Sequence, residues 1–496
     1  MEEGTGVAAS LERRLSLGIP GLDEILLGGL IPRRSYLLAG QPGAGKTIFA
    51  FQWLREMQRQ GLRTQYISLA EAGGEIRRNM AAFGWDLAGI ELLDLTPHDE
   101  LDDAATGDYR IFAPNEVEEA SSWGAIFRTV REKRPQCLVI DSLTHLRYLS
   151  PDEFQFRKKV ISLVSFLGRS QCTAILTFEV SELEQESGVA MAVDGLIRLR
   201  NDVSPSRVAA LRSVQIDKFR GSDFLSGFHA MRITPAGIVV FPHRVERTGP
   251  ERIGDAQLSS GSSDLDELLG GGLEAHTTTI ISGPPGTGKT SLGVEFLRRA
   301  AEAGQRAVLF CFDESVESIV YRARTIGAPL EAQLASGSLQ ILRTSLLEEY
   351  PDEFLAQVRL AVERDGASIV MFDSLRGYQL VMEQFGSPLS HIHNLIHYLR
   401  RSGVTCLMIN EFESINGDAQ ATELGISHLA GNIILMRYAE YQGRIIKVIT
   451  CLKKRSGRFQ SELRELHIGP NGLNVGGKLD QLQGVLMGVP SWRPPQ

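Results

Sequence analysis

The sequence has few cysteines, and no two of them stand at metal-binding or redox spacing. Five cysteines are spread over 496 residues, and Cys-x-x-Cys does not occur. An odd, scattered set argues against a disulfide framework and against a zinc site. Most lie in apolar runs, such as Val-Leu-Phe-Cys-Phe around Cys311. We therefore expect buried free thiols in a reducing compartment.

Long apolar runs and a basic excess are also missing. No apolar stretch approaches the roughly 20 residues that span a bilayer, and the N-terminus has no apolar signal-peptide core. Lys and Arg total 52 against 60 Asp and Glu, a net charge of −8, whereas nucleic-acid binders usually carry a basic excess. We expect a cytoplasmic protein whose partners include neither a membrane nor nucleic acid.

Length and glycine, in contrast, are plentiful. At roughly 100–200 residues per domain, the chain length predicts two to four domains. Glycine accounts for 50 of 496 residues, more than the usual share of about 7%. This excess indicates many tight turns or close backbone approaches.

The sequence is a tandem repeat. Residues 15–30, LSLGIPGLDEILLGGL, align without a gap with residues 258–273, LSSGSSDLDELLGGGL. The offset of 243 residues persists through the following motifs and then falls to 232, so the first half contains about eleven extra residues. We place them in a polar surface loop at 97–110.

The repeat and its composition predict the domain organisation and fold class. We expect one domain at 14–246, a second at 254–478, a short charged linker between them and a short tail at 479–496. In each half, apolar strand-like runs alternate with amphipathic helical runs, which is typical of βαβ units. We therefore expect an α/β fold in which a mainly parallel sheet is flanked by helices, and the later strands form an antiparallel edge.

Each half contains GxxxxGK[ST] directly after a predicted strand and before a predicted helix. Glycines let backbone N–H groups wrap phosphates, the lysine reaches the terminal phosphates, and the hydroxyl ligates Mg²⁺. Two matches in register make an accidental glycine turn a poor explanation. The expected nucleotide-binding residues are Gly40, Gly43, Gly45, Lys46 and Thr47 in the first half, and Gly283, Gly286, Gly288, Lys289 and Thr290 in the second.

A strand that ends in a carboxylate follows in each half, at Asp141 and at Asp373. Such an aspartate can simply cap the next helix. Beside a P-loop it is more typical of a Mg²⁺ ligand acting with the P-loop threonine. The expected metal site therefore consists of Thr47 and Asp141 in one half, and Thr290 and Asp373 in the other.

Together these motifs resemble the RecA superfamily and, more closely, the KaiC family of circadian-clock ATPases and autokinases. The resemblance rests on the tandem P-loops, the GLDE…GG lead-in, AAFGWDL and IDSLT, and covers residues 14–490. It implies two tandem RecA-like domains with ATP and Mg²⁺ as cofactors. It also implies ATP hydrolysis at the subunit interfaces of a homo-oligomeric ring, by resemblance a hexamer.

The resemblance also points to catalytic carboxylates. In that family two consecutive glutamates end the strand after the P-loop helix, and the first polarises the attacking water. Here the first half has Ala70 and Glu71, and the second has Asp313 and Glu314. We infer slow or altered hydrolysis in the first half and a more competent site in the second. The alternative is that Glu71 takes over through a small loop shift.

Two basic motifs follow equivalent strands in the two halves. The resemblance places them on a loop facing the neighbouring subunit's nucleotide, where a cation can neutralise charge during phosphoryl transfer. Solvated surface side chains are the alternative. The residues are Lys218 and Arg220 in the first half, and Lys453 and Arg455 in the second.

The chain departs from the family pattern at the autophosphorylation pair. Alignment puts Ser427 on the family's serine and His428 on its threonine, so one acceptor hydroxyl remains. Ser427 is thus a candidate phosphoacceptor or a plain loop serine. The short C-terminus makes us expect no binding of the activator KaiA. A KaiB-like or signalling protein is the partner that the resemblance suggests.

Two other functions fit the same core. One is a RecA- or RadA-type DNA-handling ATPase, which the acidic balance and the lack of an evident DNA-binding module disfavour. The other is a nucleotide-sensing scaffold with weak turnover. The leading expectation is a KaiC-like ATPase with a regulatory or signalling output and Ser/Thr autokinase activity in the second domain.

Overall fold

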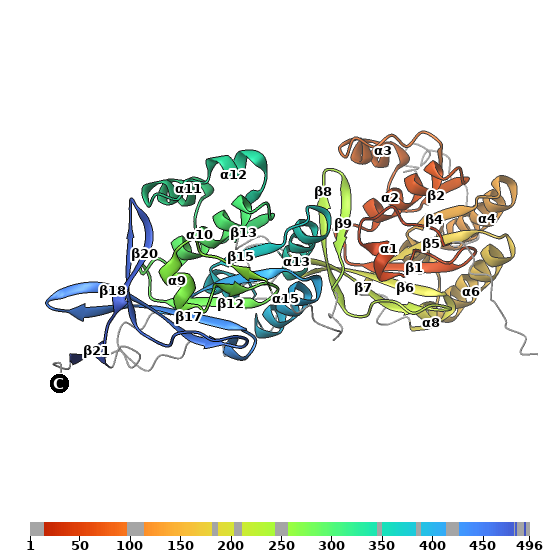
Figure 1. Cartoon of the computed structure of the whole chain (residues 1–496). Helices are drawn as coiled ribbons and strands as arrows, with labels where there is room; N and C mark the ends of the chain where they lie inside the picture. Colours follow the sequence, from red (N-terminus) through yellow and green to blue (C-terminus); the bar gives the residue numbers. More distant parts are fainter. Residues whose placement is uncertain are drawn as a thin grey trace, which may run out of the picture. The chain divides into compact units, whose positions relative to one another are not determined.

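The chain forms two compact units, Met1–Arg244 and Val245–Gln496, in a computed structural model (Figure 1). The structure describes residues 14–96, 114–180, 187–202, 211–243, 256–344, 350–382, 388–412, 426–480, 482–483 and 491–492. The expected loop at 97–110, most of the expected linker and most of the expected tail lie outside these residues. The described ranges contain no helix long and apolar enough to cross a bilayer.

The first unit is built on a nine-stranded sheet in the order β3-β2-β4-β5-β1-β6-β7-β8-β9. Its strands are β1 (Ser35–Gly40), β2 (Thr64–Ser68), β3 (Ile90–Asp94), β4 (Cys137–Asp141), β5 (Thr173–Phe178), β6 (Gly195–Asp202), β7 (Leu211–Phe219), β8 (Phe228–Thr234) and β9 (Gly237–Phe241). Its helices are α1 (Leu22–Ile25), α2 (Lys46–Arg59), α3 (Gly73–Ala81), α4 (Pro114–Lys133), α5 (Leu143–Leu149), α6 (Glu153–Arg169) and α8 (Ser187–Ala192).

The second unit repeats this order as β14-β13-β15-β16-β12-β17-β18-β19-β20. Its strands are β12 (Thr278–Gly283), β13 (Ala307–Cys311), β14 (Leu339–Arg343), β15 (Ile369–Asp373), β16 (Thr405–Glu411), β17 (Asn432–Tyr441), β18 (Arg444–Lys454), β19 (Arg464–Gly469) and β20 (Gly472–Lys478). Its helices are α9 (Ser263–Leu268), α10 (Lys289–Glu302), α11 (Val316–Thr325), α12 (Glu331–Ser336), α13 (Pro351–Arg359), α14 (Leu375–Met382) and α15 (Pro388–Ser402).

Both sheets are parallel up to β6 or β17 and antiparallel beyond, which confirms the expected fold class. Two short pairs complete the described strands, β10 (Gln257–Leu258) with β11 (Leu273–Glu274) and β21 (Leu482–Gln483) with β22 (Ser491–Trp492).

Alternating side chains of β1 fill two cores on opposite faces of the first sheet. Tyr36 and Leu38 pack in the cluster that contains α2, whereas Leu37 and Ala39 pack in the cluster that contains α6. A strand buried on both faces needs a continuous apolar run, which explains SYLLAG. All five cysteines are buried and free, as expected. Because both faces of the sheet are covered, the polar motifs lie at the C-terminal ends of the strands, where the P-loops follow β1 and β12.

Candidate functional site

Each P-loop connects a central strand to a helix, β1 to α2 and β12 to α10. The backbone angle φ is 76° at Gly43 and 102° at Gly45, and 79° at Gly286 and 103° at Gly288. L-residues rarely adopt such positive values, so glycine is needed at these positions. The two loops therefore share one conformation, and each opens a helix whose N-terminal N–H groups attract anions.

The two P-loop lysines differ in their contacts. Lys46 donates hydrogen bonds to the carbonyl oxygens of Gly40 and Gln41, at 2.7 and 3.2 Å. Its pKa is lowered by burial, which Asp141 and Glu179 partly oppose. Lys289, only 3% exposed, donates to the Pro284 carbonyl and forms a 2.9 Å ion pair with Glu411.

The threonine and aspartate of each expected metal site lie together. Thr47 Oγ1 donates to Asp141 at 3.0 Å, and Thr290 Oγ1 donates to Asp373 at 2.7 Å. A hydroxyl and a carboxylate beside a phosphate-binding loop form a donor set that suits Mg²⁺, which prefers oxygen ligands and takes others from phosphate and water. Burial raises the pKa of Asp373 to about 6, as expected for a desolvated carboxylate.

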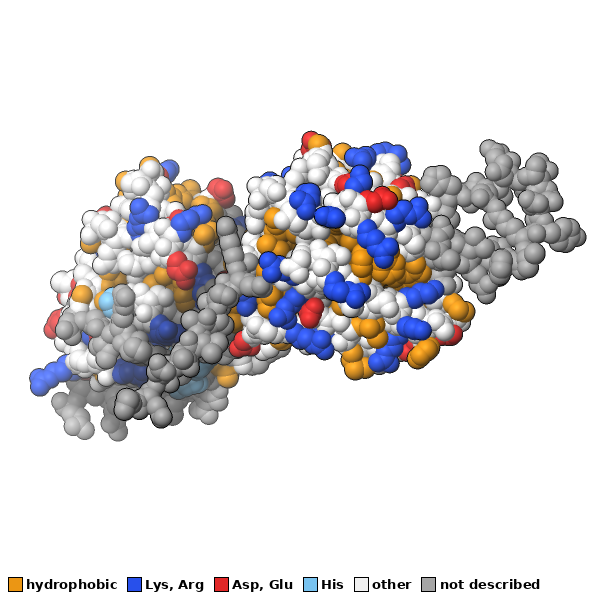
Figure 2. Space-filling view, turned by 90° about the vertical axis from the view of Figure 1, so that its right-hand side faces the viewer, with side chains coloured by type: hydrophobic (Ala, Val, Ile, Leu, Met, Phe, Trp, Pro, Cys, Tyr) orange, Lys and Arg blue, Asp and Glu red, His pale blue; other side chains and the backbone are white. Residues whose placement is uncertain are grey.

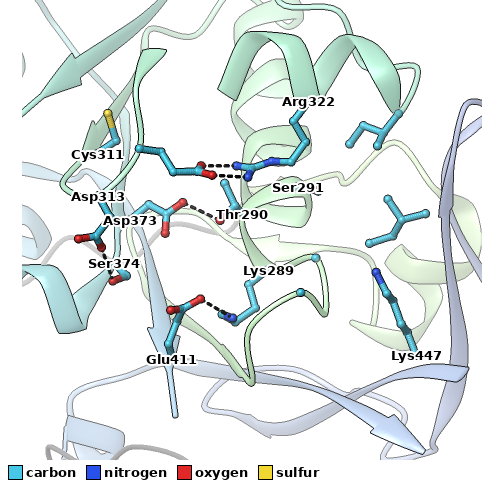
Figure 3. Close-up of a pocket in the computed structure, with 15 residues that line it drawn as sticks. Lys289, Thr290, Ser291, Cys311, Asp313, Arg322, Asp373, Ser374, Glu411 and Lys447 are labelled. Carbon is cyan, nitrogen blue, oxygen red and sulfur yellow. Dashed lines mark hydrogen bonds and ion pairs between the residues drawn. The ribbon is translucent and has the colours of Figure 1, made fainter. Parts of the chain in front are cut away.

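The acidic residues after β2 and β13 accept hydrogen bonds from side chains of other segments. Glu71 accepts a hydrogen bond from Asn79 at 2.6 Å, while burial raises its pKa. Glu314 accepts two hydrogen bonds of 2.6 Å from Arg322, one on each oxygen (Figure 3). Asp313 accepts one from Ser374 Oγ at 3.2 Å.

These second-half side chains line a cavity of about 520 Å³. This volume lies within the usual range for small-molecule sites, roughly 300–1,000 Å³. Figure 3 draws Arg322 on one side of the cavity and the Lys289–Glu411 pair on another, with Thr290 and Asp373 between them. The arrangement can hold a polyphosphate with a hydrated divalent cation.

Comparison with known proteins identifies the family of the chain. The family model "ATPase: KaiC" matches residues 15–245 and again 258–480. The chain belongs to the KaiC ATPase family. It is 28% identical over 494 residues to "Circadian clock protein KaiC3" of Synechocystis sp. (strain ATCC 27184 / PCC 6803 / Kazusa), covering 97% of this chain and 95% of that one.

Other members of the family align equally well along the chain. "Circadian clock oscillator protein KaiC 1" of the same organism is 27% identical over 489 residues, covering 95% of this chain and 91% of that protein. "Circadian clock oscillator protein KaiC" of Acaryochloris marina (strain MBIC 11017) is 26% identical over 486 residues, with coverage of 95% and 90%. The similarity is therefore not confined to the P-loops.

The four basic residues of this KaiC-family chain lie away from the P-loops of their own units. Lys218 donates to the carbonyls of Ala190, Met191 and Val193, at 2.6–3.2 Å. Arg220 donates to the Met191 carbonyl at 3.3 Å. These bonds fix the first pair beside the start of β6, the strand that follows α8.

The second pair repeats this arrangement. Lys453 donates to the carbonyls of Ser427 and Ala430, and Arg455 to that of His428. Lys453 pairs with Ile433 near the start of β17, whereas the P-loop follows the end of the parallel strand β12. The basic residues and the P-loop therefore occupy opposite edges of the same sheet.

Several contacting residues were missed by motif analysis. Tyr66 OH and Thr177 Oγ1 both donate to Asp141, and Lys447 lines the cavity of the second half. Arg322 and Glu411 were missed as well. The repeat itself offered one signal, because Glu179 and Glu411 are separated by the later offset of 232 residues.

The surface carries charges of both signs. On the face in Figure 2, Lys and Arg side chains are interspersed with acidic and uncharged ones. The net charge of −8 differs from the basic excess that is typical of a nucleic-acid-binding domain.

Proposed function

We propose that this chain binds Mg²⁺ and ATP at both P-loops and hydrolyses ATP, faster at the second site than at the first. The observation that carries the proposal is the duplicated set of P-loop glycines, lysine, threonine and aspartate, with matching backbone angles. The rate difference is inferred from Asp313, which supplies a leading carboxylate where the first half has Ala70.

The chain's own groups would divide the work of phosphoryl transfer. Backbone N–H groups of the P-loop and the lysine bind the phosphates and neutralise their charge. Thr47 with Asp141, and Thr290 with Asp373, would hold Mg²⁺, which would supply positive charge to the phosphates during transfer. ATP hydrolysis releases inorganic phosphate. The direct test therefore compares the rate of phosphate release by wild type with that by the Lys46→Ala/Lys289→Ala double variant. Turnover that survives in the double variant would overturn the proposal.

The proposed active form is a homo-oligomeric ring, a hexamer. Each subunit interface would hold one nucleotide bound by the first domain and one bound by the second. Its support is the position of Lys453 and Arg455, at the opposite sheet edge from their own P-loop. Cations placed there can serve a nucleotide only in a neighbouring copy, which makes turnover depend on assembly.

Subunit mixing tests this arrangement. Lys289→Ala removes a P-loop lysine and Lys453→Ala removes a cation of the opposite edge, so each variant alone should be slow at the second site. Mixed rings contain some interfaces with both residues intact, and mixing should restore part of the turnover. Absence of any restoration in verified mixed oligomers would contradict a shared site.

We also propose Ser/Thr autokinase activity with Ser427 as the acceptor. Ser427 lies in the short 3₁₀ turn Ile426–His428, and its carbonyl accepts a hydrogen bond from Lys453. The acceptor is therefore beside a cation that would face the neighbour's γ-phosphate. Phosphate incorporation from labelled ATP should be lost in Ser427→Ala and retained in the exposed control Ser456→Ala. Equal incorporation in both would exclude Ser427.

The relatives are named as circadian clock proteins, and we propose a regulatory or signalling output for this chain, through a KaiB-like or signalling partner in the cytoplasm. The test is capture of a partner whose binding differs between ATP-bound and ADP-bound protein. Salt-dependent DNA binding at two ionic strengths would instead favour the DNA-handling alternative.

A further inference from the structure

Two histidines on consecutive turns of α15 (Figure 1) face one another. His393 and His397 are four residues apart, which places them on one face of the helix. Their Nε2 atoms are 3.2 Å apart. The ring centroids are 4.3 Å apart and the ring planes are inclined by 53°, so the rings are tilted rather than stacked face to face. The contact between the two side chains is therefore made by their ring nitrogens.

The helix holds this pair in place and leaves it open to solvent. Its apolar residues are buried in the core of the second unit, among them Ile392, Leu395, Ile396 and Leu399. Arg400, on the next turn, donates a hydrogen bond to the Leu429 carbonyl and ties the helix to the segment before β17. His393 is exposed and His397 is half-buried. An ion with its water ligands can therefore reach two imidazoles that a packed helix already positions.

The distance between the two nitrogens matches the spacing of two ligands on one metal ion. A bond from zinc to a histidine nitrogen is about 2.0–2.1 Å long, so two such nitrogens lie roughly 3.3–3.4 Å apart at tetrahedral positions and roughly 2.8–3.0 Å apart at right angles. The observed 3.2 Å lies between these spacings. An ion can therefore bridge the two imidazoles with little movement of either side chain.

Without a metal, the two imidazoles form a hydrogen bond in which one Nε2–H donates to the other Nε2. A neutral imidazole carries its proton on either nitrogen. When the donor ring moves its proton to Nδ1, both Nε2 atoms present lone pairs to the same point and no proton is lost. The hydrogen-bonded pair is therefore the metal-free form of a two-nitrogen chelate.

The kind of ion follows from the ligands. Imidazole suits Zn²⁺, Cu²⁺ and Ni²⁺, whereas Mg²⁺ prefers oxygen ligands. Within the described ranges, no group of three or more His, Cys, Asp or Glu side chains could hold a metal ion. The pair would thus be an open site with two protein ligands, and water would fill the other positions. Neither histidine lines the cavity at the second P-loop, so this site is separate from the one expected for Mg²⁺.

We propose that His393 and His397 chelate a divalent transition-metal ion of the nickel, copper and zinc group. The ion would bind to Nε2 of each ring and keep water in its remaining positions. The site lies on the helix that Arg400 joins to Leu429, the residue directly after the Ile426–His428 turn. A bound ion would therefore add positive charge to a helix attached to the segment that carries Ser427.

The test is titration of the untagged, nucleotide-free full chain with Ni²⁺ at pH 7.5, followed by calorimetry. Millimolar Mg²⁺ is present throughout, because it occupies oxygen sites but competes poorly for imidazole. Loss of an outer-shell partner alone typically weakens metal binding by about 10–100-fold, so His393→Gln and His397→Gln should each weaken the Kd for Ni²⁺ at least about tenfold. The matched control is His391→Gln on the same helix, where the residue four positions on is Leu395; it should bind Ni²⁺ like wild type.

Cu²⁺ supplies a second measurement that reports the ligands themselves. Its electron paramagnetic resonance spectrum should show coupling to imidazole nitrogen in wild type, and this coupling should disappear in His393→Gln/His397→Gln. An unchanged Kd for Ni²⁺ in that double variant would place the ion elsewhere and overturn the inference. Absence of binding to wild type at millimolar Ni²⁺ would reduce the pair to a hydrogen bond. Neither measurement depends on ATP turnover, so failure here is separate from failure of the proposed function.

Discussion

Arg322 donates a hydrogen bond to each carboxylate oxygen of Glu314. At the same relative position in the first half, Glu71 accepts a single hydrogen bond from Asn79. Both pairs are eight residues apart, and the pairs are separated by the repeat offset of 243. The second site thus combines an extra cation with an extra carboxylate near the phosphates, and its charge balance depends on the pair.

The first prediction concerns that balance. Arg322→Ala leaves Glu314 uncompensated beside Asp313, Asp373 and Glu411, so the cavity should repel ATP. Both members of the pair are about one-third exposed, which limits the effect to about 1 kcal/mol, or roughly a fivefold weaker Kd. ATP titration in a Lys46→Ala background measures it.

The double variant supplies the control. Arg322→Ala/Glu314→Gln removes both charges and should return the Kd close to that of the parent. If the double variant binds as weakly as the single one, Arg322 contacts the nucleotide itself, and the charge-balance explanation fails.

The second prediction concerns stability and pH at Asp373. Its folded-state pKa is raised to about 6, chiefly by burial. A raised carboxyl pKa means that the ionised form destabilises the folded state, by an amount that is absent below about pH 4 and complete above about pH 6. In EDTA without nucleotide, Asp373→Asn should melt a few degrees higher than wild type at pH 7.5.

This difference should shrink at pH 4.5, where the wild-type carboxyl is mostly protonated. The asparagine can still accept the hydrogen bond from Thr290, so that contact is retained. Thermal denaturation at the two pH values decides the matter, with Glu440→Gln as an exposed control. A lower melting temperature for Asp373→Asn at pH 7.5 would show that the ionised carboxylate stabilises the fold.

The third prediction concerns Tyr66, whose hydroxyl donates to the same Asp141 oxygen as Thr47 does. Burial is the largest of the factors that raise its pKa, so the phenol stays protonated at neutral pH. The second half has Leu309 at this position. Tyr66→Phe removes a competitor for the carboxylate and should tighten Mg²⁺-dependent ATP binding at the first site.

A gain of about fivefold corresponds to one net hydrogen bond of about 1 kcal/mol. Titration of ATP at several Mg²⁺ concentrations in a Lys289→Ala background isolates the first site. Weaker binding by Tyr66→Phe would instead mean that the hydroxyl orients Asp141 for the metal.

The motifs predicted from sequence are those whose chemistry is local. A P-loop carries its glycines, lysine and threonine within eight residues, and a strand-end aspartate such as Asp141 is defined by the apolar run before it. The repeat alignment showed which residue of the second half corresponds to each motif residue of the first half. The mainly parallel sheet with an antiparallel edge also followed from the pattern of runs and turns, whereas the order of the strands did not.

The contacts that the sequence did not reveal depend on pairing across the fold. Glu411 reaches Lys289 because β16 lies beside β12 in a register that sets it opposite Gly283. Tyr66 reaches Asp141 from a neighbouring strand, through the side chain alone. No local pattern encodes either meeting, since both require the strand order and the register.

The central claim is that the two P-loops form unequal ATPase sites, with the second the faster. Phosphate release by Lys46→Ala and by Lys289→Ala, each checked for assembly and melting temperature, tests it most directly. We predict that Lys46→Ala keeps most of the wild-type rate and that Lys289→Ala loses most of it. Full loss of turnover in Lys46→Ala, with Lys289→Ala unchanged, would contradict the assignment.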